Sequence, residues 1–214
     1  MPALARPCVC LITDRRRVAP AARTARDEIV ALERWLDEAI GLVDLIQIRE
    51  RDLSDADLHG LVRRVASRAR GTSSRLLVND RADVALAAGA DGVHLRADGV
   101  PPARVRDVAR PGWILGRSTH APGETGDPAL DYVLFGSVFS AAVKAGGTHP
   151  ARGLAGLSTA VTASPCAVLA IGGVTIANAA DCARAGAAGV AAIGAFVTTG
   201  IRATADGMRA AFYC

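Results

Sequence analysis

The sequence predicts an α/β protein that forms a single-domain TIM (β/α)8 barrel over residues 1–214. Short apolar runs rich in Val, Ile and Leu recur eight times along the chain. These runs are continuous rather than alternating, which is typical of parallel strands that are covered on both faces. Eight strand and helix units leave about 25 residues for each, which favours a compact barrel. A doubly wound open sheet is the alternative.

The predicted elements follow one another in regular order. The strands are expected at Cys8–Thr13, Asp44–Ile48, Leu76–Val78, Gly92–Leu95, Trp113–Gly116, Tyr132–Phe135, Ala167–Ile171 and Gly189–Ile193. Helices are expected at Ala21–Leu42, Ser54–Arg68, Ala82–Ala88, Pro102–Ala109, Gly153–Ala163, Thr175–Ala185 and Thr204–Phe212, with a short segment at Ala121–Leu130. Ser54 and Thr175 are natural N-cap residues, and Pro102 fits a first helical turn.

Composition excludes several classes of protein. Half of the residues are hydrophobic and 21% are charged, as in a soluble globular protein. No apolar run reaches the length that spans a membrane and no signal segment is recognisable, so a cytoplasmic protein without a membrane partner is expected. The net charge of +4 is dispersed and only 4% of the residues are aromatic, which argues against nucleic acid as a partner. The five cysteines contain no CxxC pair and are expected to be reduced.

In a barrel of this type the active site lies at the C-terminal ends of the strands. Polar residues follow the predicted strands at these ends: Thr13, Asp14, Gln47, Arg49, Glu50, Arg51, Asn79, Asp80, His94, Asp98, Ser118, His120 and Lys144. Gly172, Gly173 and Gly194 follow strands seven and eight, where backbone N–H groups commonly hold a phosphate. The sequence therefore predicts a small phosphorylated ligand at this end of the barrel.

Some of these polar residues have structural interpretations. His94 is expected to be a hydrogen-bonded core residue rather than a base. Asp14 is expected to cap a helix or to anchor Arg49, and a catalytic role is equally open for it. Glu50 is expected to form an ion pair with Arg49.

Seven strings of residues carry a family resemblance. They are Leu11–Asp14, Ile46–Asp52, Leu77–Asp80, Gly89–Leu95, Gly116–His120, Asp131–Gly136 and Ala170–Gly173. In this order and spacing they resemble the thiamine phosphate synthase and TenI family. The resemblance implies a barrel enzyme that joins hydroxymethylpyrimidine diphosphate to thiazole phosphate and releases pyrophosphate with Mg²⁺ as cofactor. A homodimer is one assembly compatible with it.

The resemblance also implies roles for individual residues. Gln47, Arg49, Arg51 and Asn79 would bind the pyrimidine substrate, and Asp80 would bind the metal. Ser118 and Lys144 would act near the diphosphate as catalytic residues. The loops of Gly172–Gly173 and Ile193–Gly194 would surround the thiazole phosphate.

The chain departs from the family pattern at three places. Arg51 stands where lysine is usual. Gly99 occupies the position of a second metal-binding aspartate, so Asp98, one residue earlier, is the substitute candidate. Ala141 and Val143 replace two threonines of the loop that contains Lys144.

Two other functions therefore remain open beside the synthase. A TenI-like tautomerase is one, although Ser137 stands where a catalytic histidine is common. A catalytically silent barrel that binds a phosphorylated ligand is the other.

Overall fold

Eight apolar segments pair side by side as parallel strands and close into a barrel in a computed structural model that describes residues 4–140 and 151–213. The strands are β1 (Cys8–Ile12), β2 (Leu45–Ile48), β3 (Arg75–Asn79), β4 (Gly92–Leu95), β5 (Ile114–Thr119), β6 (Tyr132–Gly136), β7 (Ala167–Ile171) and β8 (Gly189–Ala192). Each strand pairs with the next one in the sequence, and β8 pairs with β1. The predicted TIM barrel is confirmed.

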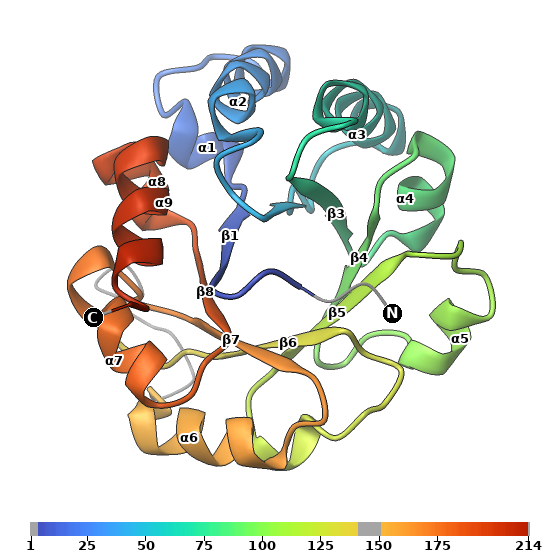
Figure 1. Ribbon diagram of the computed structural model, residues 1–214. Helices are drawn as coiled ribbons and strands as arrows, with labels where there is room; N and C mark the ends of the chain where they lie inside the picture. Colours follow the sequence, from blue (N-terminus) through green and yellow to red (C-terminus); the bar gives the residue numbers. More distant parts are fainter. Residues whose placement is uncertain (1–3, 141–150, 214) are drawn as a thin grey trace.

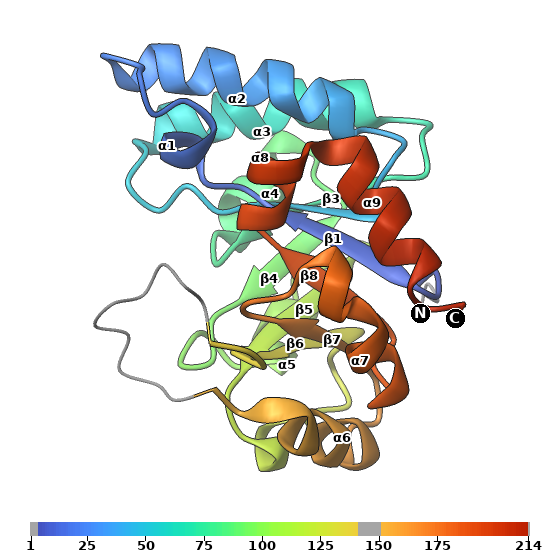
Figure 2. The ribbon, with the colours of Figure 1, turned by 90° about the vertical axis from the view of Figure 1, so that its left-hand side faces the viewer.

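The helices form a ring outside the strands (Figure 1). They are α1 (Arg15–Val18), α2 (Ala25–Ala39), α3 (Asp55–Ala69), α4 (Ala82–Ala88), α5 (Pro102–Arg106), α6 (Gly153–Ala163), α7 (Ala179–Arg184), α8 (Gly194–Thr199) and α9 (Ile201–Ala210), with 3₁₀ turns η1 (Pro122–Glu124) and η2 (Ile176–Asn178). Figure 2 shows α2 and α3 side by side on one flank of the barrel and α6 and α7 on the other. Within residues 4–140 and 151–213, no helix is long and apolar enough to cross a membrane.

Capping residues decide where several helices begin. The Ser54 hydroxyl accepts a hydrogen bond from Asp57 N at 3.1 Å, which confirms Ser54 as an N-cap. Thr24 does the same for α2, accepting from Asp27 N at 3.1 Å, so the helix predicted from Ala21 starts at Ala25. Such caps contribute about 1 kcal/mol each. The helix predicted over Ala121–Leu130 is only the turn η1.

The apolar residues form two layers because successive strand side chains point to opposite faces. One layer lies between the strands and the helices and includes Leu11, Ile46 and Phe196. The other fills the inside of the barrel and includes Cys10, Leu77 and Tyr132. The barrel is therefore packed along its axis, and ligands have access to its ends.

Candidate active site

The ends of β2 and β3 are joined by a side-chain hydrogen bond. Gln47 is buried, and its Nε2 donates to Asn79 Oδ1 at 2.9 Å. The Gln47 Oε1 atom is buried and has no hydrogen-bond partner within the described part of the chain. Leaving such an acceptor unpaired costs about 1–3 kcal/mol. This oxygen is therefore suited to accept a hydrogen bond from a ligand N–H group.

Two arginines bring positive charge to the end of β2. Arg49 N donates to Thr13 Oγ1 at 2.9 Å, which ties the start of this loop to the end of β1. Burial lowers the pKa of Arg49, and the nearby Arg51 cation lowers it further. An arginine stays protonated at neutral pH. A partly buried cation beside another favours the binding of an anion, which would relieve their repulsion.

A pocket of about 210 Å³ lies between the loops that follow β2, β3 and β4. Arg51, Asn79 and Asp80, which the sequence predicted as site residues, contribute to its wall together with Arg81 and Arg96. The pocket thus brings together groups of both charges. This arrangement suits a ligand that carries an anion and a cation, such as a diphosphate with a bound metal ion.

Asp80 is held by Arg96. Its backbone is left-handed, with φ of +62°. Asp80 Oδ1 accepts from Arg96 N at 2.9 Å, and Oδ2 pairs with Arg96 Nε at 2.5 Å. The Asp98 side chain is 81% exposed and lies 3.8 Å from the same Nε atom. Asp98 as a metal ligand stays a prediction.

The fit of Mg²⁺ to this site depends mainly on one carboxylate. Within residues 4–140 and 151–213, no group of three or more His, Cys, Asp or Glu side chains is placed to hold a metal ion. Mg²⁺ commonly takes only one or two protein carboxylates and completes its shell with water and substrate phosphates. Asp80 fits that role once the exposed Arg96 side chain moves aside. The residues therefore suit a magnesium ion that arrives with a diphosphate.

Ser118 belongs to a hydrogen-bonded group that spans three strands. His94 Nε2 lies 2.8 Å from Ser118 Oγ, and its Nδ1 lies 2.9 Å from the Tyr132 hydroxyl. Burial lowers the pKa of His94 to about 3, and the charge of Arg49 contributes. The imidazole is therefore neutral at pH 7, and the prediction of a hydrogen-bonded core histidine is confirmed. Tyr132 was not predicted as a site residue, although it is the one polar side chain in its apolar run.

A cluster of ion pairs around Arg15 holds the loop that follows β2. The buried guanidinium pairs with Glu50 at 3.1 Å and with Asp52 at 2.6 Å. Its Nε lies 2.7 Å from the Glu28 carboxylate, an ion pair without hydrogen-bond geometry. The expected pairing of Glu50 with Arg49 is therefore wrong, because Arg15 occupies that carboxylate.

Asp14 caps α1 beside this cluster. Its carboxylate accepts from Arg17 N at 3.3 Å. This confirms the cap, one of the structural roles expected for Asp14.

Glycine backbones form the loops after β7 and β8. Gly172 has φ of +92° and Gly173 has φ of +65°. A Cβ atom on Gly172 would lie 2.4 Å from Ser137 Cβ, so no other residue fits there. Gly194 follows Ile193 and opens α8, and a Cβ atom on it would lie 3.4 Å from Arg17 Nη1. The Arg17 guanidinium therefore lies beside the predicted phosphate loop, a contribution that the sequence analysis missed.

The loop after β6 begins beside a histidine. His120 Nδ1 lies 2.7 Å from the carbonyl oxygen of Gly136, the last residue of β6. An imidazole is therefore adjacent to Ser137. Lys144, Ala141 and Val143 lie outside the described residues.

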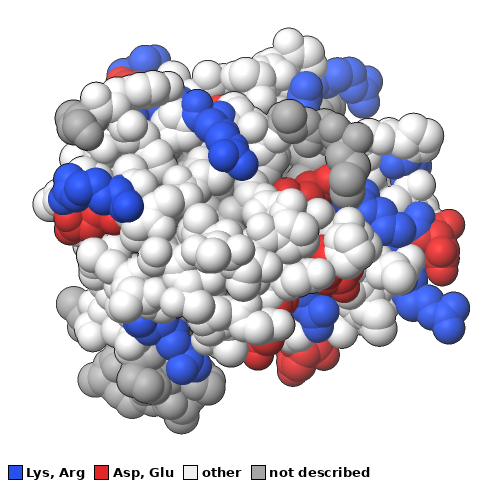
Figure 3. Space-filling view, turned by 60° about the horizontal axis from the view of Figure 1, so that its bottom comes forward, with Lys and Arg blue, Asp and Glu red and all other residues white. Residues whose placement is uncertain are grey.

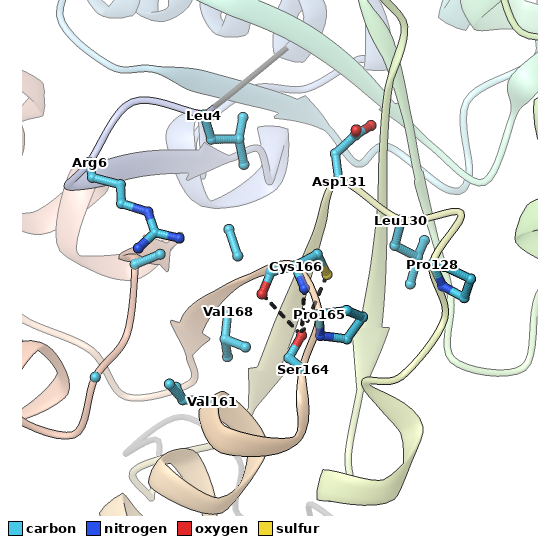
Figure 4. A pocket seen from close by; sticks show the side chains of 13 residues that line it. Leu4, Arg6, Pro128, Leu130, Asp131, Val161, Ser164, Pro165, Cys166 and Val168 are labelled. Atoms are coloured by element: carbon cyan, nitrogen blue, oxygen red, sulfur yellow. Dashed lines mark hydrogen bonds between the residues drawn. The ribbon is translucent and has the colours of Figure 1, made fainter. Parts of the chain in front are cut away.

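A larger cavity, of about 700 Å³, lies at the opposite end of the barrel. Figure 4 shows Arg6, Asp131, Ser164 and Cys166 around it. Its polar side chains form hydrogen bonds with the backbone near the starts of strands: Asp131 accepts from Leu115 N at 2.7 Å, and Ser164 donates to Cys166 O at 3.0 Å. We therefore place the active site at the other end, where the predicted residues lie.

Charged side chains are dispersed on one face of the molecule. On the face drawn in Figure 3, basic and acidic side chains are interspersed and separated by uncharged surface. The described part of that face shows no continuous basic patch.

Comparisons of sequence identify the relatives of this chain. Residues 9–196 match the family described as thiamine monophosphate synthase. The chain is 37% identical over 190 residues to a putative thiamine-phosphate synthase of Geobacter sulfurreducens, covering 87% of this chain and 85% of that protein. It is 38% identical over 195 residues to a thiamine-phosphate synthase of Roseiflexus castenholzii, covering 90% and 82% of the two chains.

Comparisons of structure agree with these relatives. A thiamine phosphate pyrophosphorylase from Pyrococcus furiosus superposes with a TM-score of 0.77 at 27% identity, covering 96% of this chain and 95% of that one. A 3-hexulose-6-phosphate synthase superposes with a TM-score of 0.63 at 16% identity, covering 95% and 99%. The second likeness supports the barrel fold alone.

Proposed function

The chain belongs to the thiamine monophosphate synthase family, and we propose that it is a thiamine-phosphate synthase. In this reaction the methylene carbon of hydroxymethylpyrimidine diphosphate loses pyrophosphate and forms a bond to the thiazole nitrogen of thiazole phosphate. The C–O bond electrons leave with pyrophosphate, and the nitrogen lone pair forms the new C–N bond. The observation that carries the proposal is the convergence of Gln47, Asn79 and Asp80 at the ends of β2 and β3.

The pyrimidine ring is assigned to Gln47 and Asn79. Gln47 uses its Nε2 to hold Asn79 and keeps Oε1 unpaired. That oxygen is suited to accept from the ring amino group. Because the hydrogen bond to Asn79 fixes the amide, the orientation is set before the substrate binds, which reduces the entropy lost on binding.

The diphosphate is assigned to Arg49, Arg51, Ser118 and Lys144. The departing group carries increasing negative charge, so cations and an O–H donor that face it stabilise the transition state more than the ground state. Arg49 is partly buried, which strengthens its interaction with an anion. Lys144 is included on the sequence resemblance alone.

A magnesium ion is assigned to Asp80; Asp98, whose side chain is 81% exposed, is the weaker candidate for a second ligand. When bound, the ion would neutralise charge on the leaving diphosphate. The residues of the chain would then have two tasks: Asp80 would hold the ion in the pocket, and the apolar side chains of Ile48, Leu53 and Leu58 in its wall would limit the access of water. Exclusion of water protects the electron-poor methylene carbon from hydrolysis.

The thiazole phosphate is assigned to the loops of Gly172–Gly173 and Ile193–Gly194. Gly172 and Gly173 have positive φ angles that residues with a side chain rarely adopt, and Arg17 adds a guanidinium beside Gly194. Backbone donors and a nearby cation together favour a phosphate dianion.

A thiazole tautomerase is the second candidate, and one observation favours it. His120 contacts Gly136 O at 2.7 Å, so an imidazole lies close to the position where Ser137 replaces a histidine of the TenI branch. A proton shift of this kind needs an acid or base and no metal.

One assay separates these functions. The purified chain is incubated with both synthase substrates and Mg²⁺, and thiamin phosphate and pyrophosphate are measured; the thiazole carboxylate phosphate is assayed in parallel. Formation of both synthase products in equal amounts supports the proposal. Tautomerisation alone supports the second candidate. Binding of the phosphorylated substrates without turnover would indicate a silent binding protein.

Three further properties are proposed from the sequence. The described cysteines Cys8, Cys10, Cys166 and Cys182 are free thiols, as expected of a protein in the cytoplasm. A homodimer and a single domain over residues 1–214 complete the proposal. Sedimentation of the purified chain tests the dimer.

A further inference from the structure

A chain of two hydrogen bonds leads from the inside of the barrel toward the site. Tyr132 on β6 is fully buried, and its hydroxyl lies 2.9 Å from His94 Nδ1 on β4. The other ring nitrogen of His94 lies 2.8 Å from Ser118 Oγ near the end of β5. Ser118 is only partly buried, so its hydroxyl is the end of this series of hydrogen bonds that a ligand can reach.

Gly116 on β5 makes this series of hydrogen bonds possible. The strand register places His94 beside Gly116 and Gly116 beside Tyr132. A Cβ atom on Gly116 would lie 2.1 Å from Tyr132 Cζ, so any side chain there would displace the ring. With glycine between them, the His94 and Tyr132 rings approach to 5.5 Å between centroids across β5. Ser118 follows two residues later on the same face of β5.

The direction of the hydrogen bonds follows from a count of protons. A neutral imidazole carries one N–H and therefore donates to one neighbour and accepts from the other. Within the described residues, His94 Nδ1 is the one acceptor that the Tyr132 hydroxyl reaches. If Nδ1 carried the proton, the tyrosine O–H would be buried without an acceptor, at a cost of about 1–3 kcal/mol. The tyrosine therefore donates to Nδ1, and His94 donates from Nε2 to Ser118.

We propose that Tyr132 is a positioning residue for the diphosphate: through His94 it makes Ser118 Oγ an acceptor on its inner side, so that the Ser118 O–H points outward to the anion. Reversal of the two bonds would turn that proton inward and present only oxygen lone pairs to a negatively charged ligand. The role in diphosphate binding rests on the proposed function, whereas the direction of the bonds does not.

The first experiment determines the tautomer of His94 directly. The full chain is produced with ¹⁵N-labelled histidine and with His59, His120 and His149 replaced by Gln, so that His94 gives the remaining histidine signals. We expect a protonated Nε2 and an unprotonated Nδ1 at neutral pH. A protonated Nδ1 would overturn the proposal. This measurement leaves Tyr132 intact, so it is decisive even if a tyrosine variant fails to fold.

The second experiment measures the effect on anion binding. Inorganic pyrophosphate with Mg²⁺ is titrated calorimetrically into the wild type, Tyr132→Phe, Ser118→Ala and the double variant. We expect Tyr132→Phe to weaken binding about fivefold in the wild type and less than about twofold in the Ser118→Ala background, because the tyrosine acts through the serine. Tyr213→Phe is the matched control, since Tyr213 is 75% exposed and should bind as the wild type does.

Two outcomes contradict the proposal in different ways. An equal loss in both backgrounds would mean that Tyr132 acts by general packing. No pyrophosphate binding by the wild type would overturn the diphosphate role together with the proposed function, and the histidine spectrum would then still decide the direction of the hydrogen bonds.

Discussion

Asp80 Oδ1 lies 3.3 Å from the point where Gly99 would carry a Cβ atom. The carboxylate that we assign to Mg²⁺ therefore faces position 99, while the neighbouring Asp98 side chain is 81% exposed. This geometry explains why a loop with aspartate one residue early is not equivalent to the family pattern. It also shows where a second carboxylate would have to be added.

We expect Gly99→Asp to lower the Mg²⁺ concentration required for half-maximal synthase activity by about tenfold, because a second carboxylate beside Asp80 adds an oxygen ligand for the ion. The measurement is initial rate against Mg²⁺ at saturating substrates. Asp98→Asn is the matched comparison and should change this concentration much less than Asp80→Asn does. A larger effect of Asp98→Asn would establish Asp98 as the ligand and contradict our interpretation of the loop.

Lys144 is the only lysine in the chain and remains where the loop has lost both threonines. We expect Lys144→Ala to lower kcat/KM for the pyrimidine diphosphate about ten- to a hundredfold, as loss of a charge-assisted contact of about 1.5–3 kcal/mol implies. Arg51→Lys keeps the charge and should have a smaller effect. Both are compared at saturating Mg²⁺. Full activity of Lys144→Ala would remove this residue from the site.

Strand order was predictable because each strand is a continuous apolar run, and burial on both faces demands such runs. Helix bounds were less predictable. Thr24 rather than an apolar residue sets the start of α2, and Gly200, with φ of +88°, separates α8 from α9. Gly194 was predicted only as part of a phosphate loop, so α8 was not expected. Local hydrogen bonds and the conformations of single residues thus set the helix ends, which hydrophobic periodicity does not predict.

The positions of the candidate site residues were predictable where these residues follow strands in the sequence. Gln47 and Asn79 met as expected because parallel strands end at the same edge. Tyr132 was not anticipated, because its contact with His94 depends on the gap at Gly116 in the strand between them. The pairing of Arg15 with Glu50 joins residues 35 apart in the sequence, and no spacing rule identifies such a partner.

Arg17 provides a test of the phosphate loop. We expect Arg17→Ala to raise the KM for thiazole phosphate about tenfold, because a guanidinium beside Gly194 contributes a charge-assisted contact to the phosphate. Arg16→Ala is the matched control, because its side chain is 68% exposed and pairs with Asp52. An equal change in both variants would show that the loop responds to overall charge and would contradict a direct contact.

The buried imidazole of His94 predicts a specific dependence of stability on pH. Burial lowers its pKa from 6.5 to about 3, so between these values the unfolded chain binds a proton that the folded chain does not. The free energy of unfolding therefore has its full contribution from His94 above pH 6.5 and loses it as the pH falls toward 3, by an amount on the order of a few kcal/mol. Asp52, whose pKa is lowered from 3.8 to about 2 chiefly by Arg15, loses its contribution in a lower range of pH.

Denaturant unfolding at pH 7 and at pH 4.5 tests this prediction. The difference in the free energy of unfolding between the two pH values should be smaller in His94→Gln than in the wild type. An equal difference in the two proteins would mean that the pKa of His94 is not lowered in the folded chain.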